Sequence, residues 1–306
     1  MNKKRIFTSL VNLPKYERVV ILGNFDGLHK GHQALLKRGI RTAKKNNLIT
    51  SVFTFHPQIQ SYLNKEFKYL LSNEDKLKRI FNLGIDEIIS LPFDQNIMHC
   101  TPIDFMQKIL KEQLYAKYIV SGYNFSFGYK GEGQAKDLKA VFGETHTDII
   151  EPVTCNAHII SSTLIKDNLT LGNLELANDM LGYPFTLSGI VTHGNKNGRK
   201  FGFPTANLAL PENIILPRDG VYAGKASFKG KDFATVVSIG LRPSVDSDPK
   251  KTIEAHLLNF SQEIYGEELR ISLYKFLRPI EKFSTIELLI KAIENDILET
   301  SAYFIR

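Results

Sequence analysis

The sequence has few cysteines and no long apolar run. Its two cysteines among 306 residues, Cys100 and Cys155, lie in different segments and form no C-x-x-C pair. We therefore expect neither a disulfide framework nor a cysteine-based metal site, and we expect a reducing, cytoplasmic location. No apolar stretch reaches the roughly 18 residues of a membrane span, so we expect no membrane segment. The basic N-terminal stretch has no apolar core or small-residue cleavage site, so no secretory signal is expected.

The chain is basic, with a net charge of +7. Its lysines and arginines are scattered apart from short groups at 2–5 and 43–47. This pattern favours a solvated surface that attracts anionic substrates over a nucleic-acid-binding face, so we expect no nucleic-acid partner. The sequence does not fix the oligomeric state, and a homo-oligomer remains open.

The length favours two domains. In the first half, apolar runs alternate with helix-like segments, which is typical of an α/β fold with a parallel sheet. Thr101 is expected to cap one helix, with Pro102 at its first position. We expect strands at 18–23, 48–55, 86–93, 117–125 and 148–153, and helices at 31–46, 73–84, 101–116 and 174–182.

The pattern of apolar and turn-forming residues changes near residue 183. Short β-type runs at 188–194, 220–228, 232–240, 252–260 and 269–277 are separated by Gly, Pro, Asn and Asp. They predict a small antiparallel barrel or sandwich. A closing helix is expected over 284–304, with Ser284 as its N-cap. We therefore expect domains at 1–182 and 183–306.

The stretch VVILGNFDGLHKGHQALLKRG, residues 19–39, leaves a strand through Gly23 and Gly27 and enters a helix at His29 and His32. A glycine turn before a helix N-terminus suits phosphate, at the carboxyl end of parallel strands. It is neither the dinucleotide fingerprint nor a P-loop. The two histidines, three apart, face the same side of the first turn. They could be surface residues or metal ligands without a clear third partner, but stabilising a phosphate transition state explains the glycines and imidazoles together.

This stretch resembles the H-x-G-H signature of adenylyl- and cytidylyltransferases. Its longer form, GNFDGLHKGH, is similar to that of bacterial FAD synthetases. Further similar segments follow in order: FTFHPQ (53–58), LPFDQ (91–95), VSGYNFSFGYKGEG (120–133) and IISSTLIK (159–166). The resemblance implies a Rossmann-like nucleotidyltransferase domain that converts FMN and ATP to FAD and pyrophosphate with Mg²⁺.

The resemblance also implies roles for single residues. His29 and His32 would hold the α-phosphate as it reacts, and Asn24 and Asp26 would order the turn or the assembly of metal and phosphates. The implied nucleotide-binding residues are Gly23, Asn24, Phe25, Asp26, Gly27, Ser161, Ser162, Thr163 and Lys166, and the implied flavin-binding residues are Asn124, Phe125 and Phe127.

Three positions depart from the family pattern. Asn124 replaces an aspartate, Gln58 falls in an altered proline–histidine segment, and Lys166 replaces an arginine. Because lysine is a point charge where arginine is a planar fork, the last change weakens bidentate phosphate binding. We expect activity at an equal or reduced level.

A second constellation lies at VTHGNKNGRKFGFPTANLALP, residues 191–211. Taken alone, a Gly/Asn-rich loop between strands is a hairpin. Thr205 and Asn207, two apart in an extended segment, point to the same side. A hydroxyl and an amide oxygen there suit magnesium and phosphate.

This half resembles riboflavin kinase, whose pattern is matched at every fixed position from Gly189 to Asn207. LPRDGVYAG (216–224), IGLRPSV (239–245) and IEAHLLNFSQEIYGEEL (253–269) continue the resemblance. It implies conversion of riboflavin and ATP to FMN and ADP, with Glu254 as the catalytic base and Thr205 and Asn207 holding magnesium with ATP. Without this motif order, Glu254 would be an ordinary exposed strand acid. The other implied residues are Gly198, Arg199, Gly202 and Pro204 for the nucleotide and Arg242 for flavin or phosphate.

Together the two halves predict a bifunctional transferase whose substrates are ATP, riboflavin and FMN. Two alternatives remain at this point. One is an enzyme that retains only one of the two activities. The other is a non-catalytic, flavin-responsive regulator that binds RNA or a partner through its basic surface.

Overall fold

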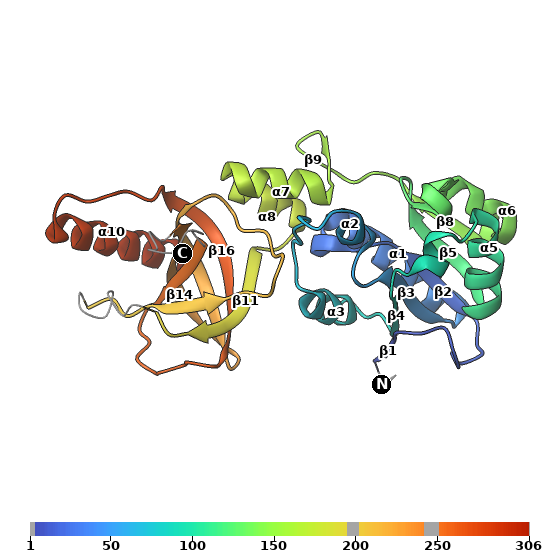
Figure 1. Ribbon diagram of the computed structural model, residues 1–306, viewed down its shortest axis with the longest axis horizontal. Helices are drawn as coiled ribbons and strands as arrows, with labels where there is room; N and C mark the ends of the chain where they lie inside the picture. Colours follow the sequence, from blue (N-terminus) through green and yellow to red (C-terminus); the bar gives the residue numbers. More distant parts are fainter. Residues whose placement is uncertain (1–3, 195–201, 242–250, 306) are drawn as a thin grey trace. The chain divides into compact units, whose positions relative to one another are not determined.

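The computed structural model describes residues 4–194, 202–241 and 251–305. The chain folds as two compact units (Figure 1). The first comprises Met1–Tyr69 and Asn73–Ser162, and the second comprises Leu70–Ser72 and Thr163–Arg306. Among the described residues, no helix combines the length and apolarity of a bilayer span.

The first unit is built on a six-stranded parallel sheet, as the alternating pattern predicts. The strand order is β1-β4-β3-β2-β5-β8, and every neighbouring pair is parallel. Because the chain builds outward from β2 to β3 and β4 on one side and to β5 and β8 on the other, the sheet has a switch point beside β2, where ligands bind. The strands are β1 (Arg5–Phe7), β2 (Arg18–Leu22), β3 (Ile49–Phe55), β4 (Glu87–Leu91), β5 (Ala116–Gly122) and β8 (Thr147–Ile150).

Helices connect these strands. The main ones are α1 (Lys30–Asn46), α2 (Ile59–Leu63), α3 (Asn73–Asn82), α4 (Gln95–Met98), α5 (Pro102–Asp104) and α6 (Leu138–Phe142). The 3₁₀ turns are η1 (Asp26–Leu28), η3 (Tyr129–Gly131), η4 (Ala135–Asp137) and η5 (Glu144–His146), and two hairpins pair β6 (Ser126–Phe127) with β7 (Gly133–Gln134) and β9 (Thr154–Cys155) with β10 (His158–Ile159).

The second unit contains a closed antiparallel barrel (Figure 1). The order of its strands is β11-β12-β15-β14-β13-β16. Its strands are β11 (Phe185–Thr192), β12 (Ala206–Ala209), β13 (Gly220–Phe228), β14 (Lys231–Leu241), β15 (Lys251–Leu257) and β16 (Glu268–Arg278). Pairing of β11 with β16 closes the ring. Helices α7 (Ser162–Leu171) and α8 (Leu174–Leu181) precede the barrel, and α10 (Ile286–Phe304) packs on β13 and β14.

Several local features differ from the sequence-based expectation, and the short elements α2, α6 and β12 were not predicted. The N-cap of α10 is Thr285, whose hydroxyl accepts the Leu288 N–H, so the prediction of Ser284 was wrong by one residue. Thr101 does cap α5, but the helix continues as a π-helix, η2 (Phe105–Gln113). Strand β1 was not predicted, because three residues are too short to show an alternating pattern.

A buried ion pair ties the strands together at the end where they begin. Arg18 of β2 and Glu87 of β4 are both fully buried, and Arg18 Nε lies 2.5 Å from Glu87 Oε1. Ser51 of β3 and Tyr16 donate hydroxyl hydrogen bonds of 2.6 Å to the same carboxylate. The remaining guanidinium N–H groups donate to the carbonyls of Pro14, Tyr16 and Leu114. Every polar atom of the pair is thus directed to a partner, as a buried charge requires.

We expect Arg18→Met to destabilise the first unit by about 3–5 kcal/mol, because it leaves the Glu87 carboxylate buried without its cation. The matched control is Arg38→Met, since Arg38 pairs with Asp148 at 2.7 Å but is half exposed. That surface pair contributes at most about 1 kcal/mol. Hydrogen exchange of peptides from β2 and β4, measured by mass spectrometry, reports the stability of the first unit separately from that of the second. Equal protection in the two variants would contradict the expectation.

Candidate active sites

The turn after β2 has an unusual backbone. Phe25, which is fully buried, has a φ of 57°, and Gly27 has a φ of 73°. A non-glycine residue in the left-handed region is strained and is held there by its surroundings. The ring of Phe25 lies 5.3 Å from that of His32. The predicted residues Gly23 to Gly27 thus form a tight, fixed turn at the carboxyl end of the central strand.

His29 and His32 lie together at the start of α1. His29 is the N-cap, and its Nδ1 accepts the His32 N–H at 3.4 Å. The two imidazoles stack at a centroid distance of 3.7 Å and an angle of 21°. Because Nδ1 of His29 accepts, the proton of its neutral ring lies on Nε2, which is a donor. Nδ1 of His32 is buried and has no hydrogen-bond partner among the described residues.

Both histidines are held uncharged. Burial lowers the pKa of His29 to about 4. Burial, the neighbouring His29 and the ammonium of Lys76 together hold the pKa of His32 well below its usual 6.5. At neutral pH the pair therefore offers neutral N–H donors, and the N-terminus of α1 adds positive potential.

Other predicted residues hold this turn in place. Thr54 Oγ1 and Gln58 Nε2 donate to the Asn24 carbonyl at 3.4 and 3.5 Å. Gln58, one of the departures from the family pattern, is only 3% exposed. Ser162, the first residue of α7, donates its hydroxyl to the Asp26 carbonyl at 2.9 Å. The structure thus brings Asn24, Asp26 and Ser162 together, although they lie far apart in the sequence.

The remaining predicted residues make fewer contacts with the turn at 23–27. Phe127 packs in the core against Phe105 at 5.2 Å, with Phe125 stacked on it at 5.7 Å, whereas Asn124 is exposed. Ser161 immediately precedes α7, and Thr163 and Lys166 lie on that helix within the second compact unit.

Sequence reasoning missed Lys76, on α3. Its side chain is 2% exposed, and burial lowers its pKa to about 8, partly offset by the carboxylate of Asp26. The helical period contained a signal: Lys76 lies four residues before the buried Ile80, on the same face.

The second site lies where β12 meets β15. Asn207 is directly opposite Glu254 in the antiparallel register. Thr205 Oγ1 donates to Glu254 Oε2 at 3.3 Å, across 49 residues of sequence. His256 Nδ1 lies 2.8 Å from the Pro204 carbonyl and so anchors the segment that leads into Thr205. The predicted base and both predicted magnesium-holding side chains therefore form one group.

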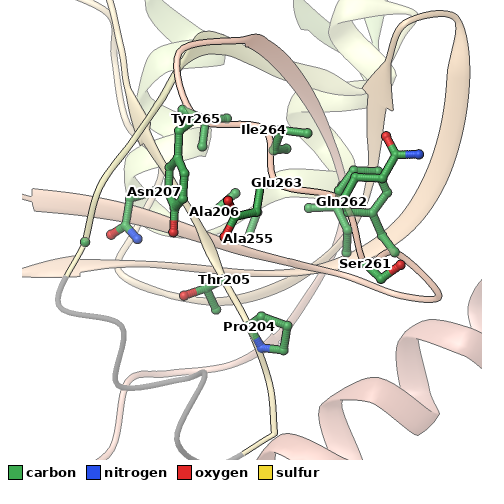
Figure 2. A pocket seen from close by; sticks show the side chains of 14 residues that line it. Pro204, Thr205, Ala206, Asn207, Ala255, Ser261, Gln262, Glu263, Ile264 and Tyr265 are labelled. Atoms are coloured by element: carbon green, nitrogen blue, oxygen red, sulfur yellow. The ribbon is translucent and has the colours of Figure 1, made fainter.

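A cavity of about 260 Å³ opens beside this group (Figure 2). The polar ends of Thr205, Asn207 and Tyr265 are turned toward the same space. Phe260, Gln262 and Glu263 form another part of the wall. Sequence reasoning gave no role to the 260–265 segment, although its motif was recognised. The ring of Tyr265 stacks on that of His193 at 3.9 Å.

At Gly194, beside the second site, there is no space for a side chain. A Cβ added to Gly194 would lie 2.2 Å from Asn207 Nδ2, so any other residue would displace that amide. Gly202 has a φ of 87°. Gly198, Arg199 and Arg242 lie outside the described residues.

The donor set of the second site fits a hard cation held together with phosphate. Within the described ranges, no group of three or more His, Cys, Asp or Glu side chains could bind a metal alone. The hydroxyl of Thr205, the amide of Asn207 and the carboxylate of Glu254 instead supply a few oxygens, as is usual for Mg²⁺ that shares its shell with a nucleotide.

Comparisons with known proteins agree with this division. The family model described as FAD synthetase matches residues 13–164, and that described as riboflavin kinase matches residues 181–304. A bifunctional riboflavin kinase/FMN adenylyltransferase from Listeria monocytogenes is 40% identical over 291 residues, which cover 94% of this chain and 92% of the relative. The protein of that description from Bacillus subtilis is 36% identical, covering 96% of this chain and 95% of the relative. The one from Escherichia coli is 33% identical, covering 97% and 96%.

A solved structure has the same architecture. The crystal structure of a Streptococcus pneumoniae protein, described as a macrolide-efflux protein, matches with a TM-score of 0.88 at 28% identity, covering 97% of this chain and 98% of that one. Both units are therefore present in an experimentally solved relative. From its two domain matches and its near full-length relatives, the chain belongs to the bifunctional riboflavin kinase/FMN adenylyltransferase family, whose members make FMN from riboflavin and FAD from FMN.

Proposed function

We propose that the two reactions take place at two separate sites, adenylylation at the His29–His32 pair and phosphorylation at the Thr205–Asn207–Glu254 group. The observation that supports this assignment best is the 3.3 Å hydrogen bond from Thr205 to Glu254, with Asn207 opposite Glu254 in the strand register. The proposed base thus lies beside two phosphate-directed side chains that line a cavity, although Thr205 and Glu254 are 49 residues apart in the sequence.

In the kinase reaction, Glu254 takes the proton of the ribityl 5′-hydroxyl as that oxygen attacks the γ-phosphorus of ATP. The Thr205 hydroxyl fixes the orientation of the Glu254 carboxylate. Thr205 and Asn207 would hold Mg²⁺ together with ATP, and the ion would supply the positive charge that offsets phosphate charge. FMN and ADP are the products.

In the adenylylation reaction, the FMN phosphate attacks the α-phosphorus of ATP in line, and pyrophosphate leaves. No covalent intermediate with the protein is required, because the step needs alignment and charge stabilisation. The N–H groups of the neutral histidines and the N-terminus of α1 supply that stabilisation as charge spreads over the α-phosphate oxygens. Ser161 and Ser162 are proposed to contact the departing phosphates, and Asn124 and Phe125 the flavin.

The alternatives are less well supported. The curated relatives are named for both activities, and the residues proposed for both reactions are present. Of the three departures, Gln58 has a defined role in holding the Asn24 carbonyl. Both cysteines are free, which fits the proposed cytoplasmic location, and small molecules without nucleic acid are the proposed partners.

We expect paired substitutions to separate the activities. His29→Ala combined with His32→Ala lowers FAD formation from FMN by at least about 100-fold, because neutral donors to the α-phosphate are lost. Glu254→Gln lowers FMN formation from riboflavin by about 10²–10⁴-fold, because the base is lost. Each variant keeps the other activity and so is its own folding control. Chromatography of flavins after incubation with ATP and Mg²⁺ measures both. Loss of both products from either variant would rule out independent sites.

The buried histidine also predicts a pH dependence of stability. As the pH falls from 6.5 towards about 4, the unfolded chain binds a proton that folded His29 does not, so the free energy of unfolding of the first unit decreases. The full decrease is about 3 kcal/mol. His29→Asn keeps an N-cap acceptor but cannot titrate, so its stability declines less steeply. Both proteins are titrated with urea at pH 7, 6 and 5. Unfolding of the first unit is monitored by hydrogen exchange of peptides from β2, which measures the difference in stability. Parallel curves would contradict the expectation.

A further inference from the structure

Lys76 is a buried cation that the reactions described above do not use. It lies on α3, 2% exposed, one residue after the buried Asp75 and four before the buried Ile80. Lysine is almost never this buried unless a specific interaction compensates for its lost hydration. Its position therefore requires an explanation.

The surroundings of Lys76 belong to the adenylylation site. Helix α3 packs against η1, the turn that contains Asp26. The groups that interact electrostatically with the Lys76 ammonium are Asp26 of that turn, His32 of α1 and His56 after β3. His32 in turn stacks on His29. One carboxylate and two imidazoles thus interact electrostatically with a single buried ammonium.

We propose that Lys76 is a positioning residue for FMN adenylylation: its buried ammonium attracts Asp26, which fixes the turn at 24–29, and it places a positive charge near the imidazole of His32. This inference rests on the proposed assignment of adenylylation to the His29–His32 pair.

The charges favour this role. The two imidazoles are neutral at pH 7, so they contribute no net charge to a site that receives ATP and a flavin phosphate. Lys76 supplies a positive charge near His32 and His56 and disfavours protonation of both rings. Burial lowers the pKa of Lys76 to about 8, and the Asp26 carboxylate opposes that change. The ammonium is therefore charged at neutral pH and is lost as the pH rises through about 8.

Three single substitutions in the full-length chain test the role. Lys76→Met removes the charge, and Lys76→Arg keeps it at every pH. Lys78→Met is the matched control, because Lys78 lies on the same helix but is half exposed and pairs with the exposed Glu74. FAD formation from FMN is measured from pH 5.5 to 9.5. Riboflavin phosphorylation in the same preparations is the internal control.

We expect Lys76→Met to lower kcat for FAD formation by about 10- to 100-fold, as for other residues that position a reacting group. In this variant the acidic limb of the pH–rate profile moves to higher pH, because His32 loses a positive neighbour that lowers its pKa. In the unsubstituted enzyme we expect the rate to decline above about pH 8, because Lys76 loses its proton. Lys76→Arg keeps most of the rate, and this decline moves to higher pH. Lys78→Met changes neither rate nor profile.

Two outcomes would overturn the inference. One is an unchanged rate and pH profile in Lys76→Met. The other is a loss of rate that Lys76→Arg does not restore and that shifts neither limb, which would mean a packing role only. If Lys76→Met fails to fold, the alkaline limb of Lys76→Arg decides alone, and an unshifted limb counts against the inference. Failure of the site assignment is seen separately, as FAD formation that survives His29→Ala combined with His32→Ala.

Discussion

The ion pair between Arg18 and Glu87 determines how the first unit is assembled. Its guanidinium and carboxylate connect β2, β3 and β4, and one carbonyl contact reaches Leu114, just before β5. Parallel strands have no tight turn between them to set their register, so a side-chain contact at their starts is an effective substitute. Since β2 has five residues, this pair lies roughly 17 Å from Gly23. Fixing one end of the strands thereby fixes where the other ends stop, and with it the turn that leads to His29.

The two sites arise from opposite kinds of sheet. In the parallel sheet, neighbouring strands end at one edge, so the first site is built from loops and a helix N-terminus, and strain at Phe25 is tolerated because the turn is held from several sides. In the antiparallel barrel, the second site is built across the ladder itself, where Asn207 faces Glu254. The barrel site therefore needs fewer supporting contacts than the turn does.

Sequence patterns predicted those parts of the molecule that depend on local chemistry. Alternation of strands and helices indicated the parallel sheet, short runs separated by turn residues indicated the barrel, and the spacing of His29 and His32 predicted that they face the same side. Features that depend on tertiary contacts escaped prediction. The distance between Thr205 and Glu254 depends on which strands become neighbours, and family resemblance alone suggested their partnership. The burial of Lys76 depends on α3 packing against η1, and the choice of Thr285 over Ser284 as cap depends on the backbone at one residue.

The last strand of the barrel, β16, affects how the chain folds while it is being translated. Strand β16 pairs with β11 on one side and with β13 on the other, so no earlier part of the ring can close without it. During translation, β11 and β13 are made before β16. Until β16 is made, the edge of each strand that pairs with β16 has unpaired backbone groups, which are usual starting points of aggregation. In the parallel sheet, by contrast, β2 pairs with β3 and β3 with β4, so these pairs form in the order in which the strands are made. A nascent chain that stops before Glu268 would therefore lack β16 and leave one edge of β11 and one edge of β13 unpaired, as an open, aggregation-prone sheet.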